Sequence, residues 1–134
     1  MELVYTNYFT KEDLRKRGYD LEADGVLDTS HFNSKEDAID DFMDNSLRAI
    51  YNLFVEYRGR NWADDFFSDM KNTDLTGKAL DLKQRLNRGL IEQAIYIYDN
   101  GDSNSNSYNQ ERIDRSPYSP KAVAELWDIL ILNF

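Results

Sequence analysis

The sequence predicts an all-α protein folded as a small helical bundle. Strand-like alternation of apolar and polar residues is nearly absent. Apolar residues instead recur at helical spacing in two long stretches, which indicates one buried face on each helix. The first stretch contains Ile39, Phe42, Met43, Leu47, Ile50, Phe54 and Tyr57, and the second contains Ala79, Leu82, Leu86, Leu90, Ala94, Ile97 and Tyr98.

The N-terminal region is predicted to hold an extended lead-in and one short helix. Residues 5–9 form the lead-in. Thr10 occupies an N-cap position with Asp13 three residues later, which is the spacing of a capping box. Gly18 ends this helix, and a loop rich in Asp and Gly covers residues 19–33.

Two helices are expected to follow this loop. Ser34 caps the first, and Glu36 and Asp37 place negative charge in its first turn, where it suits the helix dipole. Gly59 ends it. The next helix spans residues 61–71 and offers the apolar residues Trp62, Phe66, Phe67 and Met70.

One long central helix is predicted over residues 79–98, and the pair Asn100-Gly101 stops it. Residues 100–117 are rich in Ser and Asn and are predicted to be a long, flexible polar loop. Ser119-Pro120 then opens a short C-terminal helix, with proline at the first helical position. We expect residues 1–134 to form one domain in which residues 119–134 are a docking helix.

Composition excludes several classes of protein. The net charge is −9, so tight nucleic-acid binding is not expected. There is no cysteine, which rules out disulfides and thiolate metal sites. The first residues lack the pattern of a signal peptide, and no run is long enough to span a membrane. Neither a glycine-rich phosphate loop nor a Gly-x-Ser-x-Gly motif is present, so we predict a protein that is not an enzyme and has no cofactor.

An incomplete calcium-loop pattern lies near the N-terminus. Acids occupy positions one, three, five and nine of an EF-hand-like loop, and Gly25 occupies position six. Position twelve is His31 and not the glutamate that closes the coordination shell. We therefore expect an acidic turn and no metal site, with weak calcium binding as the alternative, through Asp20, Glu22, Asp24 and Asp28.

Other polar residues have ordinary interpretations. His31 is the only histidine and is expected to be a partly exposed loop residue, because catalysis needs a nucleophile or carboxylate held beside it. A di-metal helical site needs Glu-x-x-His pairs, which this chain lacks. Helix dipole and solvation account for the acids at the start of the second helix, namely Glu36, Asp37, Asp40, Asp41 and Asp44.

The aromatic content points to protein–protein contact. The chain has nine tyrosines, seven phenylalanines and two tryptophans, and large rings are enriched at interfaces. The C-terminal helix is apolar on several sides, so it needs more burial than one neighbouring helix gives. The alternative is that this helix only completes the core of its own domain. If Trp127 anchors an interface, its truncation to alanine costs about 2–4 kcal/mol of binding. The predicted interface residues are Tyr118, Val123, Leu126, Trp127, Leu130, Ile131 and Phe134.

Two segments carry a resemblance to a known family. Residues 88–102 read Arg-Gly-Leu-Ile-Glu-Gln-Ala-Ile-Tyr-Ile-Tyr-Asp-Asn-Gly-Asp, and residues 116–123 read Ser-Pro-Tyr-Ser-Pro-Lys-Ala-Val. Together they resemble the C-terminal half of the head–tail connector (adaptor, or head-completion) proteins of tailed bacteriophages. In that family a long helix ends in an Asn-Gly-Asp-like stop, and a later Ser-Pro opens a short terminal helix. The Asp-rich N-terminal loop has no counterpart in this pattern.

The resemblance implies a structural role in the virion. Such proteins are small and helical, assemble as dodecameric rings beneath the portal, extend the DNA channel and support the next tail component. It therefore implies self-association, a portal partner, and a location at the head–tail interface after assembly in the host cytoplasm. An alternative from another class is a small acidic phage or bacterial regulator that binds a host protein, for example as a nucleic-acid mimic.

Overall fold

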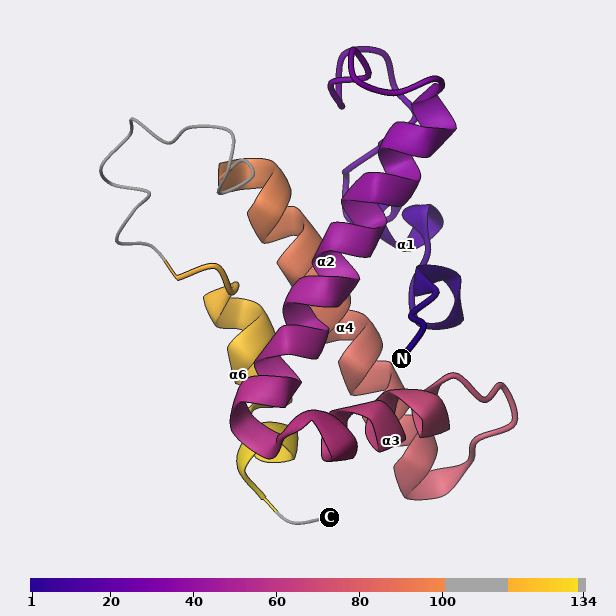
Figure 1. The fold of residues 1–134 in the computed structure, drawn as a ribbon. Helices are drawn as coiled ribbons and strands as arrows, with labels where there is room; N and C mark the ends of the chain where they lie inside the picture. The colour runs from indigo at the N-terminus through magenta and orange to yellow at the C-terminus, as the bar shows by residue number, and fades with distance from the viewer. Residues whose placement is uncertain (101–115, 133–134) are drawn as a thin grey trace.

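The protein folds as an all-α bundle, which confirms the predicted fold class (Figure 1). The structure is a computed structural model and describes residues 1–100 and 116–132. These residues form one 3₁₀ turn, η1 (Tyr5–Asn7), and five α-helices. The helices are α1 (Lys11–Arg15), α2 (Lys35–Arg58), α3 (Arg60–Met70), α4 (Gly77–Asn100) and α6 (Pro120–Ile131).

Local sequence signals set most of the helix ends. The hydroxyl of Thr10 accepts from the Asp13 backbone N–H while the Asp13 carboxylate accepts from the Thr10 N–H, as a capping box requires. The Ser34 side chain caps α2, and that of Ser119 caps α6 with Pro120 at the first position. Gly59 has a φ of +86°, a conformation that favours glycine, and there the chain turns directly from α2 into α3.

The expectation of one long central helix is wrong, because α2 and α4 contain 24 residues each. They cross in the middle of the molecule, and α6 packs mainly against α4 (Figure 1). α3 lies across the end where α2 finishes and α4 begins. The bundle therefore has a crossed pair at its centre and shorter helices around it.

The lead-in is also not extended. Backbone N–H groups of Tyr8 and Phe9 both donate to the carbonyl of Tyr5, which closes the η1 turn. This turn directs Tyr8 and Phe9 inward, where they are 5% and 1% exposed. The predicted Gly101 helix stop and most of the predicted loop 100–117 lie outside the described residues.

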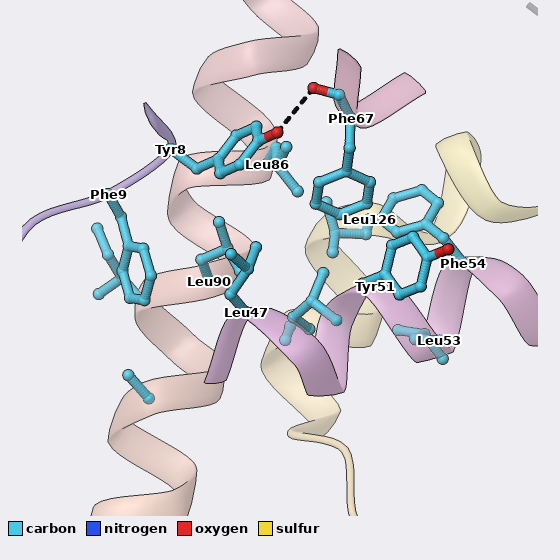
Figure 2. Packing of buried hydrophobic residues seen from close by; sticks show 14 of the residues in the cluster. Tyr8, Phe9, Leu47, Tyr51, Leu53, Phe54, Phe67, Leu86, Leu90 and Leu126 are labelled. Atoms are coloured by element: carbon cyan, nitrogen blue, oxygen red, sulfur yellow. Dashed lines mark hydrogen bonds between the residues drawn. The ribbon is translucent and has the colours of Figure 1, made fainter. Parts of the chain in front are cut away.

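Aromatic rings dominate the part of the core where α2, α3 and the N-terminal segment meet. Phe54 stacks with Phe66 at a ring separation of 5.0 Å, and Tyr8 meets Phe67 edge-on at 5.4 Å. The Tyr8 hydroxyl also donates to the Phe67 carbonyl at 2.8 Å (Figure 2). This bond satisfies a buried polar group and ties the N-terminal segment to α3.

α4 and α6 approach each other closely at Gly89. A Cβ atom at this position would lie 2.7 Å from Cδ1 of Leu126, a distance shorter than the contacts that Cβ atoms make in proteins. One turn further along α4, the side chain of Gln93 is fully buried. Its oxygen accepts from the Ser119 N–H at 2.8 Å, and its nitrogen donates to the Pro117 carbonyl at 3.0 Å. α4 thus positions the first turn of α6 through a glycine contact and a buried amide.

Candidate interaction surface

The acidic loop is occupied by interactions within the protein. Glu22 forms an ion pair with Lys11 at 2.8 Å, and Asp24 forms one with Lys35 at 2.8 Å. Asp20 accepts from the Glu22 backbone N–H at 3.1 Å, so three of the four candidate calcium ligands already have donors.

Asp28 completes this set by accepting from the Ser30 N–H at 2.9 Å. Hydrogen bonds hold the pKa of three of these carboxyls below the usual range: from Lys11 to Glu22, from Lys35 to Asp24, and from Ser30 to Asp28. Within residues 1–100 and 116–132, no group of three or more His, Asp or Glu side chains is placed to hold a metal ion. The loop geometry is that of an acidic turn whose bend is made by Gly25, at a φ of +80°.

The other polar candidates line neither of the two hollows described below. His31 is exposed in a turn. Asp44 forms an ion pair with Arg48 one helical turn later, and Asp40 accepts from the Tyr5 hydroxyl at 2.6 Å. These acids stabilise the start of α2 and its contact with the N-terminal segment.

The interface predicted on the C-terminal helix divides into two faces. Leu126 and Leu130 are 0% and 1% exposed and belong to the protein's own core, so their assignment as partner contacts is corrected. They lie on the face that α6 turns toward the core, together with Ala122 and Ile129. A partner could reach these side chains only if α6 left the bundle.

The other face of α6 leaves large apolar side chains in solvent. Trp127, Ile131 and Leu132 are 41%, 47% and 50% exposed. Tyr57 at the end of α2 is 46% exposed and meets Trp127 edge-on at 5.8 Å. We call these four residues the aromatic patch. A cluster of large, exposed apolar side chains is typical of an interaction site.

The remaining predicted interface residues border the patch or lie elsewhere. Val123 and Tyr118 are half-buried and pack against the core cluster. The Tyr118 hydroxyl donates to Glu56 at 2.8 Å. Burial, followed by this hydrogen bond, raises the pKa of Tyr118 to about 12. Phe134 lies outside the described residues.

A hollow of about 540 Å³ adjoins the aromatic patch where the ends of α2 and α6 meet α3. Arg58 lies in its wall, with its guanidinium carbon 4.2 Å from the centre of the Trp62 ring. The same side chain donates to the Leu132 carbonyl. Arg58 therefore joins the last turn of α2 to the end of α6 and to α3.

A second hollow lies on the surface, and neither hollow was predicted from the sequence. This α3–α4 groove, of about 660 Å³, lies between α3 and the first turns of α4. Its apolar wall contains Trp62, Phe66, Met70, Leu75, Ala79 and Leu82. The apolar residues of α3 and the start of α4 were visible in the sequence. Their meeting on the surface depends on how the 71–76 connection folds α3 back beside α4.

Comparison with models of protein families, with curated protein sequences and with solved structures finds no match to this chain. Among the described residues, no helix has a segment of the length and apolarity that crossing a bilayer requires. The surface of the protein and the sequence resemblance are therefore the basis for a functional proposal.

Proposed function

We propose that this protein is a non-enzymatic structural adaptor, a head–tail connector that assembles as a ring on the portal of a tailed bacteriophage. One observation carries the proposal. The C-terminal helix inserts Leu126 and Leu130 into its own core while holding Trp127, Ile131 and Leu132 in solvent beside Tyr57. A rigid helix with a fixed aromatic anchor is an effective docking element, because little conformational entropy is lost on binding.

The resembling segments support this proposal because they contact each other. Gly89 and Gln93 lie in the first segment, and Pro117 and Ser119 lie in the second. Gln93 bonds to both Pro117 and Ser119 of the second segment. Gly89 leaves room for Leu126, which lies on α6, the helix that the second segment opens. The similarity to connector proteins thus covers the residues of α4 and of the start of α6 that hold the two helices together.

The proposed assembly has two interfaces and a channel. Copies of the chain contact one another in a ring, expected to be dodecameric, and the aromatic patch docks on the portal or on the next tail component. The net charge of −9 suits a channel wall along which DNA passes without sticking. The protein would be found at the head–tail interface of the virion.

A binding experiment with the portal protein from the same genome tests the proposal. Electron microscopy should show rings of this protein on portal particles. Trp127→Ala should weaken docking by about 2–4 kcal/mol, as truncation of buried aromatic anchors does. Val4→Ala is the matched control, because Val4 is 44% exposed but precedes the η1 turn, away from α6. Absence of rings on portal, or equal docking of both variants, would contradict the proposal.

The acidic-regulator alternative has weaker support. A nucleic-acid mimic needs a regular field of uncompensated carboxylates. Here Glu22, Asp24 and Asp44 are each paired with a basic side chain. Capture of a defined host protein that is abolished by neutralising Glu36 and Asp37, while Trp127→Ala has no effect, would favour this alternative.

A further inference from the structure

The two hollows lie side by side on one face of the molecule. Both are lined by Trp62, so they meet at this side chain on α3. The hollow at the ends of α2 and α6 forms the first side of this surface, and the α3–α4 groove forms the second. We call this surface the Trp62 face.

The two sides of the Trp62 face carry opposite charge. Arg58 supplies a cation on the first side, where its contacts with Trp62 and the Leu132 carbonyl fix its position. Asp65 and Asp69 line the groove on the second side, one helical turn apart and exposed. No ion pair among the described residues involves either carboxylate. Lys78 on the α4 wall carries one positive charge against the two carboxylates, so the charged side chains that line the groove have a net negative charge.

The two sides also differ in shape. Ile131 lines the first hollow, and Leu132 follows it, with its carbonyl accepting from Arg58; both side chains are exposed by about half of their surface. The groove presents an open apolar wall that includes Phe66, Leu75 and Leu82. The Trp62 face thus has exposed apolar side chains and a cation on one side, and an apolar groove with two acids on the other.

We propose that two copies of this chain pair through the Trp62 face about a two-fold axis next to Trp62. Arg58 of each copy then lies against Asp65 and Asp69 of the other, and Ile131 and Leu132 of each enter the other's groove. A two-fold pairing uses each side once in each copy, so every contact is made twice. Because both sides lie on one face, the pairing closes at two copies and does not propagate into a ring or fibre.

This inference goes beyond the proposed function and does not depend on it. The Trp62 face includes Tyr57 and Ile131, which also belong to the aromatic patch. Pairing and docking through the patch therefore exclude each other. The free protein is then in equilibrium between monomer and dimer, and the dimer opens before the patch binds anything else.

Charge reversal tests the pairing. The protein should sediment as a monomer–dimer mixture between about 1 μM and about 1 mM, the range typical of small interfaces. Arg58→Glu and Asp69→Lys should each weaken self-association at least about tenfold, because like charges then face each other twice. Mixing the two variants should restore dimers, since the introduced glutamate of one copy meets the introduced lysine of the other, while the unchanged Arg58 meets the unchanged Asp69. Asn45→Lys, on exposed α2 surface, is the control and should leave self-association unchanged.

Cross-linking tests the position of the axis. The chain has no cysteine, so one introduced thiol reports one location. Asn61→Cys, exposed beside Trp62, should form a disulfide-linked dimer under mild oxidation, because a residue near a two-fold axis meets its own copy. Thr29→Cys, exposed in the acidic loop, should remain monomeric in the same conditions.

Four results would overturn the pairing. These are a monomer at every concentration, an assembly larger than two, dimers that the charge reversals leave intact, and equal cross-linking of Asn61→Cys and Thr29→Cys. Each leaves the docking proposal standing, because docking is measured separately with portal and Trp127→Ala. Loss of docking with dimerisation intact would, in turn, leave the pairing standing.

Discussion

At the scale of single residues, Gly89 has the most crowded surroundings of the glycines that the structure describes. A Cβ here would lie 2.7 Å from Cδ1 and 2.9 Å from Cγ of Leu126. Leu126 is fully buried, so it has little room to move aside. The glycine is therefore needed for close helix packing, although it lowers helix propensity in the middle of α4.

Gly89→Ala should destabilise the protein by about 1–3 kcal/mol in urea unfolding, because overpacking outweighs the gain in helix propensity. The same substitution in a Leu126→Ala background should have the opposite sign, stabilising by up to about 1 kcal/mol, since the clash is then absent. A destabilisation of equal size in both backgrounds would show that the contact with Leu126 is not the cause.

Three tyrosines should ionise late. Burial raises the pKa of Tyr5, Tyr8 and Tyr118 to about 12, and hydrogen bonds to Asp40 and Glu56 add to the effect at Tyr5 and Tyr118. A pKa raised by folding contributes stability that is complete below the unfolded value near 10 and is lost as pH rises toward 12. The contribution of these three tyrosines to stability should therefore be constant up to about pH 10 and fall above it.

Tyrosinate absorbance and urea unfolding at matched pH values measure this effect. Tyr8→Phe should remove one late-titrating group and reduce the alkaline loss of stability. Titration of all nine tyrosines together near their ordinary pKa would contradict the assignment.

At the scale of elements, α6 depends on α4 for the start of its first turn. Gln93 is fully buried and supplies both an acceptor for the Ser119 N–H and a donor for the Pro117 carbonyl. Ser119 in turn caps the helix by accepting from the Ala122 N–H. The orientation of the outer face of α6 follows from this arrangement.

Gln93→Met keeps the length of the side chain and removes both hydrogen bonds. We expect a loss of about 2–4 kcal/mol in unfolding free energy, because two backbone groups lose their buried partner. Gln84→Met, at an exposed position on the same helix, is the control and should change stability by less than about 0.5 kcal/mol. Equal effects of the two substitutions would mean that water replaces the amide at Pro117 and Ser119.

The sequence predicted the helices well because their end signals are local. Ser34, Gly59 and Ser119-Pro120 act on their own turns, and the structure places the helix ends beside them. The lead-in was mispredicted because the η1 turn has no such signal. Tyr8 and Phe9 are directed inward by contacts with α3 and α4, which are distant in sequence.

The candidate surface was only half predictable. Periodicity could have separated the two faces of α6, since Ala122, Leu126, Ile129 and Leu130 share helical spacing that Trp127 and Ile131 do not. Treating the helix as uniformly apolar obscured this division. The α3–α4 groove was beyond the sequence, because it forms between residues whose proximity is set by tertiary packing.

At the scale of the whole molecule, α6 completes the core. It covers α4 and part of α2, and it buries Leu126, Ile129 and Leu130 almost completely. Each such side chain contributes about 2 kcal/mol on burial, or about 6 kcal/mol for the three. That sum is comparable to the total stability of about 5–15 kcal/mol of a typical domain.

A chain ended after Ser116 should therefore show no cooperative thermal transition by circular dichroism. A chain ended after Leu132 keeps all of α6 and should unfold cooperatively near the temperature of the full chain. Cooperative melting of the shorter chain would mean that the remaining helices form a sufficient core without α6.

The contacts of the N-terminal segment also affect how the protein is made. The Tyr8 carbonyl accepts from Asn87, and Arg17 pairs with Glu92, so these partners are separated by 79 and 75 positions in the chain. At typical translation speeds, about 4–16 s pass between the synthesis of the first partner and the second. Tyr8 and Phe9 thus leave the ribosome early and do not reach all of their native contacts until α4 has emerged, so apolar side chains of the newborn chain are exposed during that interval.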